Sequence, residues 1–143
     1  MSATVLQSVS AAPSTARRVS KSVIAGRVIT GLALAFMTFD VTMKLAQVKE
    51  AVEGTAQLGF DPNIILPLGL IQLACLILYV IPRTAPLGAA FLTAYLGGAV
   101  AIHVRLGNPM FTHILSPVYV AIFLWVGLYL RDPRVRAVLG RTR

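Results

Sequence analysis

Four long apolar runs constrain this sequence more than any other feature. They cover about residues 23–41, 64–81, 86–103 and 114–130. As helices they would each measure about 26–29 Å, close to the roughly 30 Å thickness of the hydrocarbon core of a bilayer. None alternates apolar and polar residues as barrel strands do, and a helix satisfies its own backbone in lipid. The sequence therefore predicts an all-α, polytopic membrane protein whose four transmembrane helices form an antiparallel bundle.

Composition supports a lipid environment. Hydrophobic residues make up 57% of the 143 residues and charged residues 13%, against roughly 45–50% and about 25% in soluble domains. A chain this small leaves much of its surface exposed, so lipid must be its main solvent. The net charge is +8, but the basic residues flank the apolar runs. We therefore expect membrane lipids as partners, and no nucleic acid.

The chain divides into three parts. Residues 1–22 are interpreted as a disordered tail, 23–131 as the transmembrane domain and 132–143 as a basic tail. The first run continues past the cleavage-like Ala33-Leu34-Ala35, so we interpret it as an uncleaved anchor and not a signal peptide. The longest loop is 42–63, whose beginning either extends the first helix or lies along the membrane surface.

The distribution of charge predicts the orientation. The N-terminal flank, the 82–85 loop and the C-terminal tail share one side and hold ten of the 13 Lys and Arg residues. The other side holds three, with four of the five acidic residues. Because positive charge is concentrated in cytoplasmic loops, both termini are expected in the cytoplasm.

Two further patterns concern packing. Small residues recur every fourth position in the third run, along Ala89, Thr93, Gly97 and Ala101 and along Ala90, Ala94 and Gly98. Small residues allow helices to approach closely in lipid, so this helix is expected to be the closely packed one, with a homodimer seam as the functional alternative. Tyr79 is expected to anchor the second helix at the membrane interface.

Several segments resemble the DoxX-like family of small bacterial membrane proteins. They are LYVIPRTAPLGA at 78–89, LGGAVAIHVR at 96–105, PVY at 117–119, WVGLYLRD at 125–132, Phe39-Asp40 and Lys44-Leu45. The resemblance covers about residues 27–134. It implies a four-helix membrane bundle in the bacterial inner membrane. The family's namesake is a membrane subunit of a thiosulfate:quinone oxidoreductase, whereas most members have no assigned reaction.

The resemblance implies an accessory or quinone-associated component of a membrane redox system, with a quinone as the implied ligand and a redox complex or a second copy as partner. The chain departs from the family at Gln72, where relatives often carry Glu, and this puts a proton-handling role of that position in doubt. Two other classes stay open. One is a small-solute permease, and the other is a structural subunit that recruits a soluble partner through its basic tail.

Six polar residues are candidates for a ligand site: Asp40, Lys44, Gln72, His103, Arg105 and His113. Asp40 and Lys44 share a helix face, and the predicted topology brings five of the six to the outer side, with Gln72 deeper. One interpretation is a pocket for a quinone headgroup or a small anion, with a histidine exchanging protons and Asp40 orienting it. The alternative is that these residues pair and snorkel at the interface.

The sequence contains no complete catalytic constellation. The single cysteine, Cys75, cannot form an internal disulfide and is expected to be a packing residue. Two histidines are too few for a typical zinc site, and they flank one short hairpin instead of facing each other across a haem. No metal and no intrinsic cofactor are therefore expected.

Overall fold

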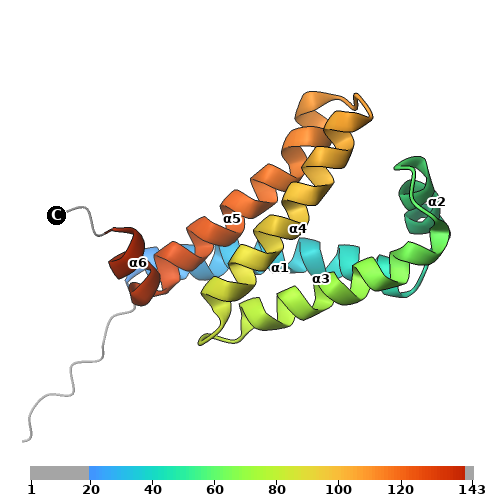
Figure 1. Ribbon diagram of the computed structural model, residues 1–143. Helices are drawn as coiled ribbons and strands as arrows, with labels where there is room; N and C mark the ends of the chain where they lie inside the picture. Colours follow the sequence, from blue (N-terminus) through green and yellow to red (C-terminus); the bar gives the residue numbers. More distant parts are fainter. Residues whose placement is uncertain (1–19, 141–143) are drawn as a thin grey trace, which may run out of the picture.

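The computed structural model describes residues 20–140, which form helices joined by short turns (Figure 1). The helices are α1 (Lys21–Leu45), α2 (Lys49–Gln57), α3 (Ile65–Val80), α4 (Ala85–Arg105), α5 (Leu115–Arg131) and α6 (Pro133–Leu139). A 3₁₀ turn, Pro62–Ile64, leads into α3, and a π-helical turn, Met110–Ile114, leads into α5. Four segments are long and apolar enough to cross a membrane, those of α1, α3, α4 and α5. The predicted all-α, multi-pass membrane fold is confirmed.

Proline and aspartate set several helix starts. Asp61 accepts a hydrogen bond from the backbone N–H of Asn63 at 2.8 Å and begins the turn before α3. Asp132 accepts from the N–H of Arg134 at 2.9 Å, with Pro133 in the first position of α6. An aspartate cap accepts a hydrogen bond from an amide that has no partner within the first helical turn. A proline at that point costs no hydrogen bond, because the N–H that it lacks would have had no helical partner. These local signals separate α6 from α5 by a single residue.

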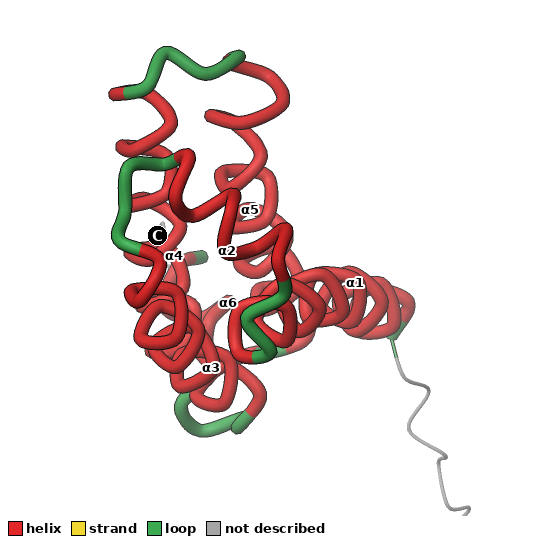
Figure 2. Tube along the Cα trace, turned by 90° about the vertical axis from the view of Figure 1, so that its right-hand side faces the viewer, coloured by secondary structure: helices red, strands yellow, loops and turns green. Residues whose placement is uncertain are grey.

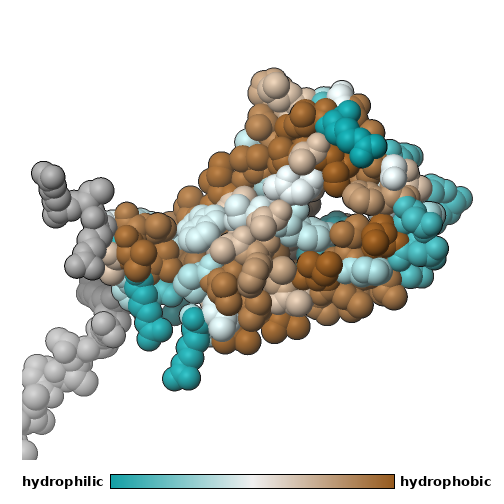
Figure 3. Space-filling view, in the orientation of Figure 1, coloured by the Kyte–Doolittle hydropathy of each residue, from teal (hydrophilic) through white to brown (hydrophobic). Residues whose placement is uncertain are grey.

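The helices that cross the membrane are arranged as a ring in which α1 and α4 each pack against both α3 and α5. Consecutive members run antiparallel, so the bundle has two ends, which we call the α2 end and the α6 end after the short helices found there. At the α6 end the four helices lie together, whereas towards the α2 end the α4–α5 hairpin leans away from α1 and α3 (Figures 1 and 2). The space-filling view shows an opening between these two arms (Figure 3).

The helix bounds differ from the predicted ones mainly at the end of the first helix. α1 continues to Leu45, where the apolar pattern had indicated an end near residue 41, so Lys44 is helical. The chain then turns at Gln47, whose φ is 49°, and α2 follows as a separate helix. The interpretation of residues 1–22 as a disordered tail falls almost wholly outside the described residues, as do residues 141–143. In the predicted basic tail, Pro133–Leu139 is helical.

Helices α1 and α5 approach each other closely. A Cβ atom added at Gly127 would lie 2.4 Å from Thr30 Oγ1, and one at Gly26 would lie 2.7 Å from the Cβ of Leu130. Apolar side chains gain nothing by leaving lipid for one another, so contact between backbones supplies the packing energy. Gly26 and Thr30 are four residues apart, a spacing of small residues that our sequence reasoning did not single out.

The expectation for the third apolar run is only partly met. Gly88 of α4 lies against the backbone of Tyr79, where an added Cβ would come within 2.3 Å of the Tyr79 nitrogen, and Ala89 is fully buried. Thr93 also meets α5, because its hydroxyl accepts a 2.8 Å hydrogen bond from Trp125 Nε1. At Gly97 and Gly98 the expectation is wrong, because nothing lies within 4 Å of an added Cβ. The second row, Ala90, Ala94 and Gly98, is exposed along its whole length and faces away from the bundle.

Tyr79 is a core residue and not an interfacial anchor. Its side chain is fully buried, and its hydroxyl donates a 2.7 Å hydrogen bond to the carbonyl oxygen of Leu124. The Arg131 guanidinium lies 5.0 Å from the centre of its ring and donates to its backbone carbonyl at 3.4 Å. Tyr79 therefore links α3 to α5 across the ring of helices at the α6 end.

The glycine contacts make a stability prediction. Gly88→Ala should destabilise the bundle by about 1–3 kcal/mol, because the methyl group meets backbone atoms that cannot move aside. Gly97→Ala is the matched control in the same helix, and it should be neutral or stabilising because alanine favours helix. Thermal unfolding in detergent compares the two variants. Equal effects would show that α3 and α4 are not in contact at Gly88.

Candidate functional site

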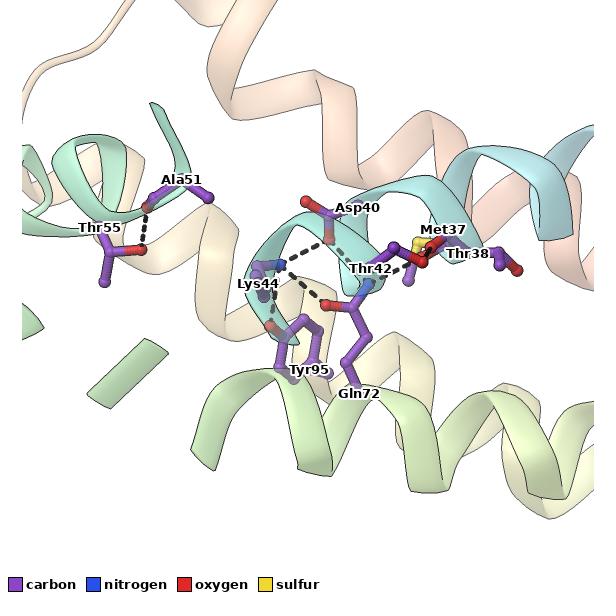
Figure 4. Close-up of polar contacts among 9 residues, drawn as sticks. All are labelled: Met37, Thr38, Asp40, Thr42, Lys44, Ala51, Thr55, Gln72 and Tyr95. Atoms are coloured by element: carbon purple, nitrogen blue, oxygen red, sulfur yellow. Dashed lines mark hydrogen bonds and ion pairs between the residues drawn. The ribbon is translucent and has the colours of Figure 1, made fainter. Parts of the chain in front are cut away.

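One ammonium group joins three of the membrane-spanning helices. The Nζ atom of Lys44 in α1 lies 2.5 Å from Asp40 Oδ2, 2.8 Å from Gln72 Oε1 of α3 and 3.2 Å from the Tyr95 hydroxyl of α4 (Figure 4). A lysine ammonium has three protons to donate, and each of these contacts can take one. We call Asp40, Lys44, Gln72 and Tyr95 the polar network.

Gln72 connects the network to the core of the bundle. Its side chain is fully buried. The Nε2 atom donates to Asp40 Oδ2 at 2.8 Å and, at 3.4 Å, to the backbone carbonyl of Met37. With Oε1 accepting from Lys44, the amide uses both of its ends. This satisfies the rule that a polar group away from water needs partners.

The burial of the ion pair is uneven. The side chain of Lys44 is 19% exposed and that of Asp40 is 40% exposed. A charge that is held away from water is stabilised by an opposite charge at contact distance and by hydrogen bonds to both partners. The second carboxylate oxygen of Asp40 points away from Lys44 and Gln72 (Figure 4). The hydrogen bonds of the network are thus satisfied on the side of α3, whereas the second oxygen of Asp40 has no partner among residues 20–140.

The structure divides the six candidate residues into separate groups. Asp40, Lys44 and Gln72 come together, as just described. His103 and His113 form a second group at the tip of the α4–α5 hairpin, where their rings meet edge to face with centroids 5.6 Å apart. His103 Nδ1 lies 2.8 Å from the side-chain amide nitrogen of Asn108.

The two groups lie on different arms of the molecule. Eight residues separate Tyr95 from His103 along α4, which is about 12 Å of helix rise. Both ribbon views show the tip of the hairpin standing apart from the end of α1 (Figures 1 and 2). Arg105 is exposed at the end of α4 and takes part in neither group. The hydrogen bonds of Asp40 within residues 20–140 go to Lys44 and Gln72, so it does not orient a histidine there.

Tyr95 is the site residue that our sequence reasoning missed. It lies ten residues before the end of α4, whereas Lys44 lies one residue before the end of α1. Alignment of the helix ends would place the two residues about 14 Å apart in depth. In the structure the two side chains meet instead, with Lys44 Nζ 3.2 Å from the Tyr95 hydroxyl. The available signal was chemical: Tyr95 is the one residue of the run 86–103 with a phenol hydroxyl.

Two other features bear on ligand binding. Among residues 20–140, no three His, Cys, Asp or Glu side chains come together in a way that could hold a metal ion. An apolar groove of about 280 Å³ lies between α1 and α3, and its lining includes none of the network residues. The polar network and this groove are therefore separate surfaces.

Comparison with known proteins decides the family. A sequence model described as the DoxX-like family matches residues 28–127, which include the whole polar network and both histidines. The chain belongs to the DoxX-like family. No curated protein and no solved structure gives a significant match. The predicted membership is confirmed, and with it the description of this DoxX-like chain as a multi-pass membrane protein.

A double-mutant cycle tests the network. Asp40→Asn and Lys44→Met should each destabilise the bundle, and together they should cost less than the sum of the two, with a coupling energy of about 1 kcal/mol or more. The reason is that either single variant leaves a partly buried charge without its partner. Unfolding of the purified protein in mixed detergent micelles gives the free energies.

The control for this cycle is Lys49 and Glu53 on α2, an ion pair with the same spacing but at 3.8 Å and with side chains 79% and 58% exposed. Exposed pairs contribute little, so Lys49→Met and Glu53→Gln should couple by at most about 0.5 kcal/mol. Coupling energies of equal size in the two cycles would contradict the arrangement around Lys44.

Proposed function

We propose that this DoxX-like protein is a quinone-associated component of a membrane redox system, and that the polar network holds the quinone headgroup. The observation that carries the proposal is the pair of groups the network leaves unused. Within residues 20–140 the Tyr95 hydroxyl accepts from Lys44 but has no acceptor for its own proton. One oxygen of the Asp40 carboxylate is likewise free and points away from the network (Figure 4).

A free donor and a free acceptor within one network suit both forms of a quinone. The carbonyl oxygen of the oxidised form accepts from Tyr95, and the hydroxyl of the reduced form donates to Asp40. Lys44 supplies a fixed positive charge behind both groups, and such a charge favours the negative charge that develops on a quinone oxygen during reduction. Asp40 is placed to give or take the proton that accompanies this change.

The electrons must come from elsewhere. Reduction of a quinone to a quinol takes up two electrons and two protons, and the network holds groups for the protons and the charge only. The proposal therefore includes a partner protein that carries the redox centre, with this chain as its quinone-binding membrane subunit. This assigns no catalytic reaction to the chain alone.

The proposal also includes a membrane and an orientation. We place the protein in the bacterial inner membrane with both termini in the cytoplasm, because ten of 13 basic residues lie at or beyond the α6 end or in the flanking tails. The polar network, which lies towards the α2 end, then opens to the outer side. Quinones dissolve in the hydrocarbon region and reach such a site from the membrane.

Quinone binding to the purified protein tests this proposal. A water-soluble ubiquinone analogue should quench the fluorescence of Trp125 or be retained by protein in lipid nanodiscs. Tyr95→Phe should weaken its affinity about tenfold, since a hydrogen bond of about 1.4 kcal/mol is lost. Asp40→Asn should weaken quinol binding more than quinone binding, because a carboxylate accepts the quinol proton better than an amide does.

Tyr119→Phe is the matched control, because it removes an exposed phenol hydroxyl from α5. His103→Ala is a second control, from the other polar group. If both controls weaken binding as much as Tyr95→Phe does, the headgroup does not sit in the network. Solute flux into liposomes that contain only this protein would instead support a permease. Unchanged quinone affinity in every variant, together with a co-purified soluble partner, would support a structural subunit.

A further inference from the structure

A second site lies at the α6 end of the bundle, away from the polar network. Four arginines from different segments line a cavity of about 580 Å³ there. They are Arg27 of α1, Arg83 of the turn between α3 and α4, Arg131 at the end of α5 and Arg134 of α6. Arginines far apart in sequence thus line one cavity.

None of these four arginines forms an ion pair with a residue between 20 and 140. The two ion pairs found among residues 20–140 are Lys44 with Asp40 and Lys49 with Glu53, both remote from this cavity. Asp132 also lines the cavity, but one of its oxygens caps α6 by accepting from the backbone of Arg134. Four permanent positive charges therefore face a single carboxylate, and the cavity attracts an anion.

One of the guanidinium groups is already held in place. Arg131 lies over the Tyr79 ring at 5.0 Å and donates to the Tyr79 carbonyl oxygen at 3.4 Å. Tyr79 is itself fixed by its buried hydroxyl bond to Leu124. A guanidinium that is ordered before the ligand arrives loses less side-chain entropy on binding.

The position of the cavity identifies the source of the anion. Its lining comes from the ends of the membrane spans and the segments that follow them, which is the depth of the phospholipid headgroups. Guanidinium forks pair with phosphate oxygens through two parallel hydrogen bonds. Basic pockets between membrane helices bind anionic headgroups in this way.

We propose that the cavity lined by Arg27, Arg83, Arg131 and Arg134 binds the phosphate headgroup of an anionic phospholipid. The site is independent of the proposed quinone function. Three of the four arginines lie outside residues 28–127, the part of the chain that matches the family model. A soluble phosphate compound could pair with the arginines through the same chemistry, and competition between it and the lipid distinguishes the two sources.

Native mass spectrometry and thermal unfolding of the full chain in detergent test the site. Phosphatidylglycerol should stay bound and raise the melting temperature, whereas phosphatidylcholine at the same concentration should do neither. Arg83→Gln combined with Arg134→Gln should weaken phosphatidylglycerol binding at least tenfold. Lys21→Gln is the matched control, because it removes one exposed charge from the same end of the bundle without lining the cavity, and it should leave binding unchanged.

A second double variant distinguishes loss of the site from misfolding of the protein. Arg83→Lys with Arg134→Lys keeps both charges but loses the bidentate forks, and it should weaken binding several-fold with unchanged helix content. Equal binding of the two lipids, or an equal loss in Lys21→Gln, would overturn the proposal in favour of diffuse surface attraction. Inorganic phosphate or glycerol phosphate that binds more tightly than the lipid would overturn the lipid as the source of the anion.

Discussion

Helices in a bilayer gain nothing by transferring apolar side chains from lipid to one another, so other contacts must hold this bundle together. The structure uses two kinds. At the α6 end, backbones approach closely at Gly26, Gly88 and Gly127. Towards the α2 end, where the hairpin of α4 and α5 leans away, the ammonium group of Lys44 reaches from α1 to α3 and α4. Backbone packing thus holds the helices together at one end of the bundle, and polar contacts hold them together near the other.

This division has consequences for function. Glycine contacts leave no room for a ligand between the helices that they join, whereas an opened arrangement with a polar network exposes groups that a ligand can use. The Asp40 carboxylate is the more exposed partner of the ion pair, and Gln72 is fully buried behind it. The same contacts that join the three helices therefore leave one donor, the Tyr95 hydroxyl, and one acceptor, an oxygen of Asp40, unused among residues 20–140. Stability and ligand recognition are both expected to depend on Lys44.

The sequence predicted the fold well because bilayer thickness and backbone hydrogen bonding leave few choices for long apolar runs. It also placed Asp40, Lys44 and Gln72 together, since spacing puts the first two on one helix face. It could not predict the lean of the α4–α5 hairpin, which depends on how side chains pack between helices. The contact of Tyr95 with Lys44 and the open space at Gly97 and Gly98 depend on the same packing.

The central claim is that one lysine joins three membrane-spanning helices. Solid-state NMR of the labelled protein in lipid bilayers measures this directly, through contacts of the Lys44 ammonium nitrogen. The account predicts contacts to the Asp40 carboxylate carbon and to the ring carbon that bears the Tyr95 hydroxyl. A Lys44 nitrogen that contacts lipid phosphate and water, and neither of these carbons, would contradict it.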